Sequence, residues 1–334
     1  MPADNDRKQE TFMKRFLPGA LLTSAALTFA PAAIAAFPEK PITLIVHFPA
    51  GSSTDVIART LAAEAGQTLG QSIIIQNKPG ADGSIAASEV ARAKPDGYTL
   101  LIATNSPMSG VPVMRKRPPY DPLKDFTPIT DIGRYSFFLY ARADEPGDTL
   151  QDFIQHIRKH PGKLSYGYGN VTGLLSFAYV ANASKVDILG VPYKGEPPMI
   201  NDMLGGQVDA AVATSGTGMP QVRAGKLKAL ATILPVRSPN APGVPTMAEA
   251  GLDGFPIAPW LGLFGPAGMS ADVVDRVDAA FKTAMEKPAV KQAMLVQDFI
   301  FTPSTPGALR KLVTDQLDSH RMLLRATGLE GSQD

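Results

Sequence analysis

The chain has 334 residues, of which 44% are hydrophobic, and it contains no cysteine. Without cysteine it cannot form disulfides or thiolate metal sites, and it has no cysteine nucleophile. The 32 lysine and arginine residues nearly balance the 31 acidic residues, so bulk charge gives no support to nucleic-acid or membrane-surface binding. The length predicts roughly two domains, each with its own core.

The first 36 residues have the pattern of a secretory signal peptide. Lys14 and Arg15 precede an apolar run from Phe16 to Phe29, and Ala33 to Ala35 form a small-x-small cleavage site. The run is too short and too interrupted by proline for a transmembrane helix, which needs about 20 apolar residues. A lipid anchor would need a cysteine. We therefore predict that residues 1–36 direct export to the periplasm, without a transmembrane helix or a lipid anchor.

A strand, a polar turn and a helix follow the signal peptide. Apolar and β-branched residues dominate Pro41 to Phe48, which predicts a strand buried on both faces. Residues 51–54 (GSST) then supply backbone N–H groups and hydroxyls where a helix begins, with Ser53 or Thr54 as its N-cap. Unpaired N–H groups and the helix dipole favour a carboxylate or phosphate there. The turn predicts an anion site, and the alternative is a plain strand-to-helix connection.

Two further strands continue this first unit. Gln71 to Gln76 and Tyr98 to Ala103 predict strands, and Ser84 to Ala93 predicts the helix between them. Strands that alternate with helices form parallel sheets, whose ligands bind beyond the carboxyl ends of the strands. The loops Pro79 to Gly83 and Thr104 to Ser106 are therefore expected to join the first polar turn at one edge of the sheet.

After a proline-rich stretch at residues 107–128, predicted to run over the surface, the chain enters a second α/β unit. Its polar turns again follow strands, notably at Thr214 to Gly218. In chain order we predict a strand within Phe126 to Ala141, a helix at Thr149 to Ile157, a strand at Lys163 to Tyr168, a polar turn at Gly169 to Gly173, a helix at Leu174 to Ala183, a strand at Val186 to Val191, a helix at Pro197 to Leu204, and strands at Val208 to Ala213 and Lys226 to Thr232.

The last part of the chain is predicted to return to the first unit through an apolar strand at Ala258 to Gly265. Two helices between Ala271 and Leu324 then follow, separated by Phe299 to Pro303. Two α/β lobes joined by two crossovers form the plan of a hinged binding protein, whose ligand lies in the cleft. We place the first lobe at residues 37–134 and 259–334 and the second at 135–258, each with a central, mostly parallel sheet flanked by helices.

Several phrases of the sequence are similar to those of one known family. FPEKPITLIVHFPAGSSTDVIAR, NKPGADGSIAASEVARAKPDGYTLL, VPYKG, and DMLGGQVDAAV followed by GKLKALA resemble the solute-binding proteins of tripartite tricarboxylate transporters, the Bug family. The resemblance covers nearly the whole chain after the signal peptide. It implies a two-lobed, type II-like periplasmic binding protein that delivers a small organic acid to a membrane permease. It also implies a carboxylate held by main-chain N–H groups, hydroxyls and ordered waters.

The second-lobe turn departs from the family pattern. Tyr168 to Thr172 stands where the family has a glycine-serine turn, and the following LLSFAYVANAS lacks the usual His-Leu and Glu. Tyr168 either stacks on an aromatic or bulky ligand or fills the cleft. Asn170 and Thr172 either bind the ligand or satisfy their own backbone. Asp82 would repel a carboxylate unless it points to solvent or meets a cationic group.

Loops of both lobes supply the predicted ligand-binding residues. The resemblance and the positions of the loops together indicate Phe48, Pro49, Ala50, Gly51, Ser52, Ser53, Ala81, Asp82, Thr104, Asn105 and Ser106 in the first lobe, and Tyr168, Gly169, Asn170, Thr172, Thr214 and Ser215 in the second.

No motif predicts catalysis, a cofactor or a metal. The sequence has no GxSxG, no phosphate loop and no paired metal carboxylates. His156 and His160 lie four residues apart but lack the glutamate of a zinc hydrolase motif, and we interpret them as cations at a helix C-terminus. We predict a monomeric binding protein, not an enzyme, whose partners are a small organic carboxylate, aromatic or dicarboxylate ligands included, and membrane permease subunits. The alternative function is a carboxylate-sensing periplasmic module that acts through a two-component sensor kinase.

Overall fold

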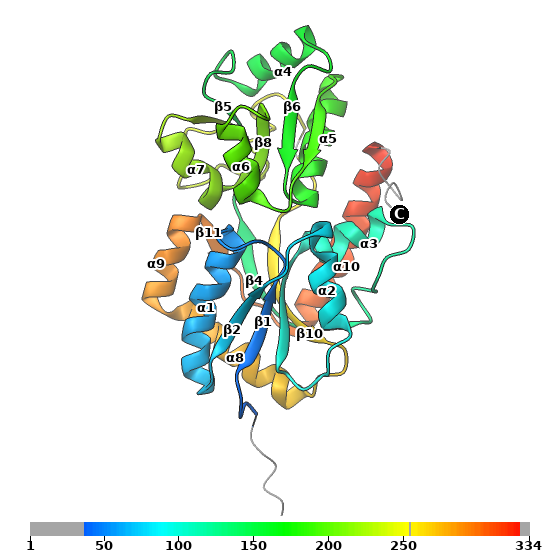
Figure 1. Cartoon of the computed structure of the whole chain (residues 1–334), viewed down its shortest axis with the longest axis vertical. Helices are drawn as coiled ribbons and strands as arrows, with labels where there is room; N and C mark the ends of the chain where they lie inside the picture. The colour runs from blue at the N-terminus through cyan, green and yellow to red at the C-terminus, as the bar shows by residue number, and fades with distance from the viewer. Residues whose placement is uncertain (1–36, 254, 328–334) are drawn as a thin grey trace, which may run out of the picture. The chain divides into compact units, whose positions relative to one another are not determined.

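The computed structural model describes residues 37–253 and 255–327, and the fold below belongs to the unit Ala36–Asp334. The predicted signal peptide lies outside the described residues. The described part consists of two α/β lobes, each built on one sheet (Figure 1). This confirms the predicted fold class. Within residues 37–253 and 255–327, no helix combines the length and the hydrophobicity that a membrane span requires.

The first lobe contains a six-stranded sheet in the order β11-β4-β10-β3-β1-β2. β1 pairs in parallel with β2 and β3, whereas β10 runs antiparallel to β3 and β4. Its strands are β1 (Ile42–Val46), β2 (Ile73–Asn77), β3 (Thr99–Thr104), β4 (Phe126–Tyr135), β10 (Trp260–Pro266) and β11 (Phe299–Phe301). Its helices are α1 (Ser53–Leu69), α2 (Ser84–Ala91), α3 (Val111–Met114), α8 (Ala271–Glu286), α9 (Pro288–Gln297) and α10 (Pro306–Thr327), with a short 3-10 helix, η1 (Ala81–Gly83), and a short π-helix, η2 (Ser106–Gly110).

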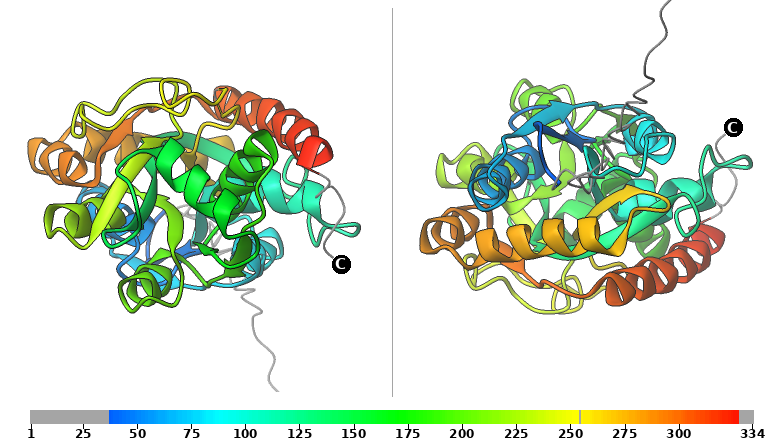
Figure 2. Two further views of the ribbon diagram at one scale, coloured as in Figure 1. Left: turned by 90° about the horizontal axis from the view of Figure 1, so that it is seen from above. Right: turned by 90° about the horizontal axis from the view of Figure 1, so that it is seen from below.

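Helices cover both faces of this sheet, as the views from above and below show (Figure 2). Along β1, Leu44 belongs to the core that also holds Ile57 of α1, whereas Ile45 packs in a second core with Ala86 of α2. Because successive side chains of a strand point to opposite faces, a strand that is apolar at both must be covered on both. The predicted two-sided burial of this strand is confirmed.

The second lobe contains a five-stranded sheet in the order β7-β6-β8-β5-β9. β6 pairs in parallel with β7 and β8, and β5 runs antiparallel to β8 and β9. Its strands are β5 (Phe137–Arg142), β6 (Ser165–Tyr168), β7 (Leu189–Pro192), β8 (Ala210–Thr214) and β9 (Leu227–Thr232). Its helices are α4 (Leu150–Lys159), α5 (Val171–Ser184), α6 (Glu196–Leu204) and α7 (Ser215–Arg223). Both sheets are mixed rather than mostly parallel, because the strands next to the crossovers run opposite to their neighbours.

The chain passes from the first sheet to the second at Ser136, the one residue between β4 and β5. The carbonyl of Ser136 accepts a hydrogen bond from the backbone N–H of Ser215 at 2.8 Å, and its own N–H donates to the carbonyl of Asp298 at 3.3 Å. This residue therefore ties the start of α7 to the segment before β11. The predicted residue limits of the lobes stay a prediction.

Three predictions about local structure were wrong. Residues 214–218 were expected to form a polar turn, but α7 begins at Ser215 with Thr214 as its N-cap. Residues 106–114 do not run over the surface: they form η2 and α3, and Met108 and Val111 are fully buried. The C-terminal part contains three helices rather than two, because Lys287 and Pro288 separate α8 from α9. Pro288 stands in the first turn of α9, where its missing N–H costs no helical hydrogen bond.

Candidate ligand-binding site

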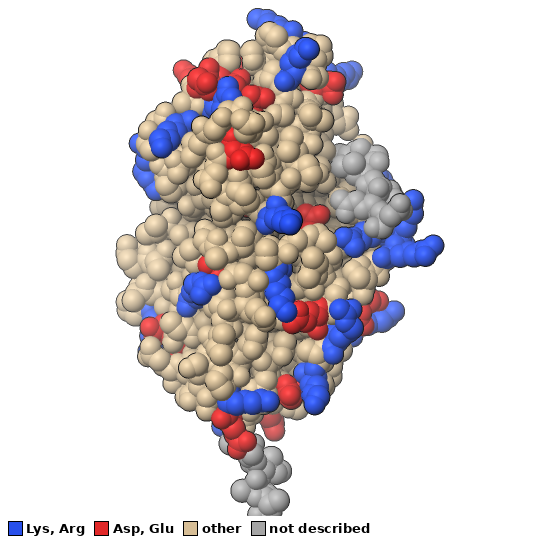
Figure 3. Space-filling model, viewed as in Figure 1, with Lys and Arg blue, Asp and Glu red and all other residues tan. Residues whose placement is uncertain are grey.

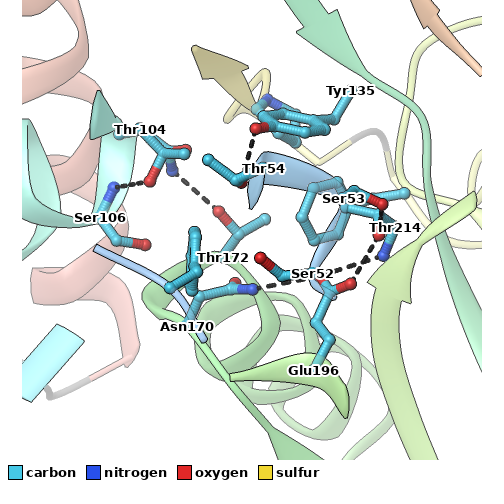
Figure 4. A pocket seen from close by; sticks show the side chains of 14 residues that line it. Ser52, Ser53, Thr54, Thr104, Ser106, Tyr135, Asn170, Thr172, Glu196 and Thr214 are labelled. Carbon is cyan, nitrogen blue, oxygen red and sulfur yellow. Dashed lines mark hydrogen bonds between the residues drawn. The ribbon is translucent and has the colours of Figure 1, made fainter. Parts of the chain in front are cut away.

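A small cavity of about 20 Å³ lies where loops of the two lobes meet (Figure 4). Most of its lining carries hydroxyl or amide groups, and no lysine, arginine or histidine is among the lining residues. These are Phe48, Ser52, Ser53, Thr54, Thr104, Asn105, Ser106, Tyr135, Phe137, Asn170, Thr172, Glu196, Thr214 and Pro259.

The turn before α1 is fixed by hydrogen bonds between its own residues. Ser52 is the N-cap, and its hydroxyl accepts the backbone N–H of Asp55 at 3.2 Å. The Asp55 carboxylate in turn accepts the N–H of Gly51 at 3.0 Å, the Arg59 guanidinium at 3.0 Å and the Asn77 amide at 2.8 Å. Gly51 has φ +81°, a left-handed conformation that suits glycine. Our prediction of Ser53 or Thr54 as the N-cap was therefore wrong by one or two positions.

Because Ser52 caps the helix, the next two hydroxyls are available to the cavity. The hydroxyl oxygens of Ser53 and Thr214 lie 2.8 Å apart, which joins α1 of the first lobe to the end of β8 in the second. The hydroxyl oxygens of Thr54 and Tyr135 lie 2.7 Å apart. Both pairs are within hydrogen-bond distance and buried, so the first turn of α1 is in contact with both lobes.

His47 holds the loop after β3 in place. Its Nε2 accepts the backbone N–H of Thr104 at 3.2 Å, so this nitrogen carries no proton in that arrangement. Burial lowers the pKa of His47 to about 3, and the imidazole is neutral at physiological pH. The Thr104 hydroxyl then accepts the N–H of Ser106 at 3.3 Å. His47 is therefore a positioning group rather than a charge in the site.

Two hydrogen bonds from the same loop reach α5 in the second lobe. The Asn105 amide donates to the Thr172 hydroxyl at 2.8 Å, and the backbone N–H of Val171 donates to the Ser106 hydroxyl at 3.1 Å. Asn170 is the N-cap of α5, and its Oδ1 accepts the N–H of Gly173 at 2.9 Å. The predicted polar turn thus ends at Asn170, and Thr172 belongs to the first turn of the helix.

Four helices therefore begin at the cavity. α1 starts at Ser53, α5 follows Asn170, α6 starts at Glu196 and α7 follows Thr214, and all four residues line it. The first N–H groups of a helix lack internal partners, and the dipole at a helix N-terminus favours an anion by about 0.3–1 kcal/mol. The start of α6 offers fewer donors than the others, because Pro197 and Pro198 in its first turn have no N–H group. Glu196 is the one acidic residue among the lining residues, it is 4% exposed, and burial raises its pKa.

Nine of the predicted ligand-binding residues line the cavity, and eight lie outside its lining. Those in the lining are Phe48, Ser52, Ser53, Thr104, Asn105, Ser106, Asn170, Thr172 and Thr214; those outside are Pro49, Ala50, Gly51, Ala81, Asp82, Tyr168, Gly169 and Ser215. Tyr168 is half-buried, with its ring 5.9 Å from that of Tyr166, and burial raises its pKa. Contact between Tyr168 and a ligand stays a prediction.

Four lining residues were not predicted to bind ligand: Tyr135, Phe137, Glu196 and Pro259. A fifth, Thr54, was part of the predicted anion turn but not of the predicted ligand-binding set. Tyr135, Phe137 and Pro259 flank the two crossovers between the lobes, and this position beside the hinge is the signal that could have found them. Glu196 directly follows the VPYKG phrase, whose polarity predicts a solvated turn. Among the described residues, no group of three or more His, Cys, Asp and Glu side chains could hold a metal ion.

Known proteins share this architecture. A family model described as "TctC: Tripartite tricarboxylate transporter family receptor" matches residues 57–329. Protein BugT of Bordetella pertussis is 31% identical over 93% of this chain and 96% of its own length. The structure of the periplasmic binding protein BugD has a TM-score of 0.84 at 32% identity, over 88% of this chain and 99% of BugD. MatC from Rhodopseudomonas palustris, solved with bound malate, has a TM-score of 0.82 at 32% identity, over 86% of this chain and 100% of MatC.

Two α/β lobes around a cavity lined mostly by residues with hydroxyl or amide groups define a two-lobed solute-binding protein, and the family match is consistent with that class. The chain belongs to the tripartite tricarboxylate transporter receptor family, which includes the Bug proteins. Members of this family are periplasmic binding proteins and not enzymes. The resemblance found in the sequence is thereby confirmed.

Proposed function

We propose that this receptor captures a small organic carboxylate in the cavity between its lobes and presents it to the permease subunits of a tripartite transporter. The observation that carries the proposal is the convergence of the N-termini of α1, α5 and α7 on a cavity whose lining residues mostly bear hydroxyl or amide groups. This combination supplies hydrogen-bond donors to a carboxylate without a cationic side chain. MatC, which was solved with malate, lends independent support.

Neutral donors are sufficient for useful affinity. A hydrogen bond to a charged group contributes about 1.5–3 kcal/mol. Four or five of them, less the cost of association, can reach the roughly −8 kcal/mol that corresponds to micromolar binding. The backbone N–H groups and hydroxyls at the start of α1 and the amide and hydroxyl groups of Asn105 and Thr172 are the donors that we assign to this role.

Further parts of the proposal concern the whole protein. We infer that residues 1–36 direct export and that the mature receptor is a monomer with no affinity for nucleic acid. We also infer that the chain crosses from one lobe to the other at residues 134/135 and 258/259. On the face shown in Figure 3, lysine and arginine are interspersed with acidic residues over both lobes. This face therefore presents no extended positive patch to which a polyanion such as nucleic acid would bind. N-terminal sequencing of periplasmic protein that begins at Ala36 or Phe37 would support the export assignment.

A ligand panel tests the proposal. Purified mature protein is titrated by calorimetry with mono-, di- and aromatic carboxylates, and at least one is expected to bind with a micromolar Kd. At a ligand concentration of 100 Kd, binding adds about 2.7 kcal/mol to the free energy of unfolding and raises Tm. If no carboxylate binds or shifts Tm at millimolar concentration, the proposal is wrong.

A matched pair of variants tests the location. Thr54→Val removes a hydroxyl that lines the cavity, and we expect about ten- to 150-fold weaker binding, the equivalent of one hydrogen bond to a charged group. Thr60→Val removes a hydroxyl of the same helix that donates to the carbonyl of Val56 within α1. It should leave Kd unchanged. Equal effects of the two substitutions would argue against the assigned cavity.

A further inference from the structure

Glu196 places a carboxylate of the protein inside the cavity that we assign to a carboxylate ligand. It is the first residue of α6, it is 4% exposed, and it lines the cavity beside Asn170 and Thr214 (Figure 4). A buried carboxylate ordinarily has a cationic partner or a metal ion, because removal of its charge from water is costly.

The hydrogen-bond partners found for Glu196 are all neutral. Its Oε2 accepts the hydroxyls of Thr214 at 2.6 Å and Thr217 at 2.7 Å. Its Oε1 accepts the backbone N–H of Thr214 at 3.1 Å and the side-chain amide of Asn170 at 3.5 Å. Burial is the largest influence on its pKa, which is raised, and these hydrogen bonds act against that influence. The negative charge is thus solvated by dipoles but not neutralised by a cation among the lining residues.

One side of this carboxylate is open to a further partner. A carboxylate offers about four lone-pair positions. The 3.5 Å contact with Asn170 is at the outer limit of a hydrogen bond, so Oε1 is the less well satisfied oxygen. Asn170 also lines the cavity. A donor on the ligand can therefore approach Oε1 from the cavity side and replace or share this contact.

The charge of Glu196 also restricts which ligands fit. A ligand carboxylate at the start of α1 adds a second negative charge to the same small and largely dehydrated cavity, and a dicarboxylate adds a third. Like charges disfavour each other strongly where water is excluded. An ammonium group on the ligand reverses the sign of this interaction and supplies the cation that the protein lacks.

We propose that Glu196 is a specificity-determining residue that selects ligands which carry an ammonium or another strong hydrogen-bond donor beside their carboxylate, and that it disfavours dicarboxylates. This inference rests on the proposed function of the cavity. It differs from a purely structural role for Glu196, in which the residue holds Thr214 and Thr217 and affects all ligands alike.

The test compares ligands of matched length by calorimetry at pH 8, on the full mature protein. The probes are dicarboxylates of four to six carbons, the corresponding ω-amino and α-amino carboxylates, and the unsubstituted monocarboxylates. In the parent protein the best amino carboxylate is expected to bind at least about tenfold more tightly than the dicarboxylate of equal length, the effect of one charge-assisted hydrogen bond. In Glu196→Gln, which keeps the shape and removes the charge, that ratio should fall to near one.

Thr60→Val is the control, because the Thr60 hydroxyl donates to the carbonyl of Val56 within α1 and Thr60 does not line the cavity. It should leave the ratio of amino-carboxylate to dicarboxylate affinity unchanged. Dicarboxylates that bind the parent as tightly as amino carboxylates would overturn the inference and leave the proposed function standing. If Glu196→Gln changes the affinity of all ligand classes by the same factor, the inference is also overturned. Failure of all classes to bind would overturn both the inference and the proposed function. The ratio of amino-carboxylate to dicarboxylate affinity in the parent protein tests the inference even if Glu196→Gln does not fold.

Discussion

Gly110→Ala should weaken ligand binding without harm to the fold of either lobe. Gly110 is the last residue of η2 in the first lobe, is buried and does not line the cavity. A Cβ built on it would lie 2.7 Å from Cγ1 and 3.0 Å from Cβ of Val171, at the start of α5 in the second lobe. Carbon atoms in good contact are about 3.5–4.0 Å apart, so the added methyl group would push the two lobes apart.

The size of the effect follows from this overlap. Overpacking of a well-packed contact costs about 1–3 kcal/mol, which corresponds to about five- to 150-fold weaker binding if the lobes must meet around the ligand. The backbone of Gly110 is helical, with φ −69°, so alanine fits it without strain. With the lobes apart the methyl group meets no obstacle, and alanine even favours a helix by up to about 1 kcal/mol. The Tm of the ligand-free protein should therefore not fall.

Calorimetry and thermal unfolding, each with and without ligand, measure these two effects. Gly307→Ala is the control, because Gly307 lies in α10 and a Cβ there would meet nothing closer than the Thr305 hydroxyl at 4.0 Å. It should leave Kd unchanged. The reasoning is refuted if Gly110→Ala binds within twofold of the parent, or if it lowers the ligand-free Tm as much as the ligand-bound Tm.

Three further substitutions test local features. Burial opposes ionisation of Asp55, but hydrogen bonds from Arg59, Gly51 and Asn77 outweigh it and lower its pKa. The stability that this carboxylate contributes is therefore present at neutral pH and lost as the pH falls below about 4. In denaturation measured against pH, Asp55→Asn should have a lower free energy of unfolding than the parent at pH 7, and the difference should disappear in acid. Burial raises the pKa of Glu196, so ionisation of this carboxyl group lowers the stability of the folded protein above that pKa. Glu196→Gln should therefore raise Tm at pH 8, and the increase in Tm should shrink towards pH 4. An increase in Tm that does not depend on pH would contradict this reasoning. Thr149→Ala removes the capping box of α4 and should lower the free energy of unfolding, measured by urea denaturation, by about 1 kcal/mol. The ligand Kd should not change, because α4 does not line the cavity.

Local sequence patterns predicted many of the strands and helices in their order, but not α3, α7 or β11. The apolar run before Phe48 and the GSST turn carry short-range signals, and both were predicted close to their observed limits. The N-cap was missed because Ser52, Ser53 and Thr54 all have the side chains that cap helices. The choice between them depends on the Asp55 contact with the N–H of Gly51, which single-residue preferences do not contain.

Residues 106–114 show a different limit. Their prolines were interpreted as loop signals, yet Pro107 and Pro112 are the second residues of η2 and α3, within the first turn, where a missing N–H costs no helical hydrogen bond. The buried contacts of Met108 and Val111 decide the structure of this segment. Those contacts come from elements distant in the sequence, so periodicity alone does not reveal them.

Glu196 could not be assigned to the site from the sequence. A charged residue in a turn after a strand is usually solvated, and the partners that bury Glu196 lie 18 and 21 residues further along the chain. Tyr135 and Phe137 were likewise hidden in an apolar strand region. The donor residues of the loops could be predicted because hydroxyl and amide groups after parallel strands share one edge of a sheet.

A crystal structure of the mature protein with a bound carboxylate tests the central claim most directly. The account predicts the carboxylate oxygens within hydrogen-bond distance of the first turn of α1, between Ser53, Thr54 and the loop that contains Asn105. A carboxylate bound outside this cavity, or one held there by a lysine or arginine side chain, would contradict it.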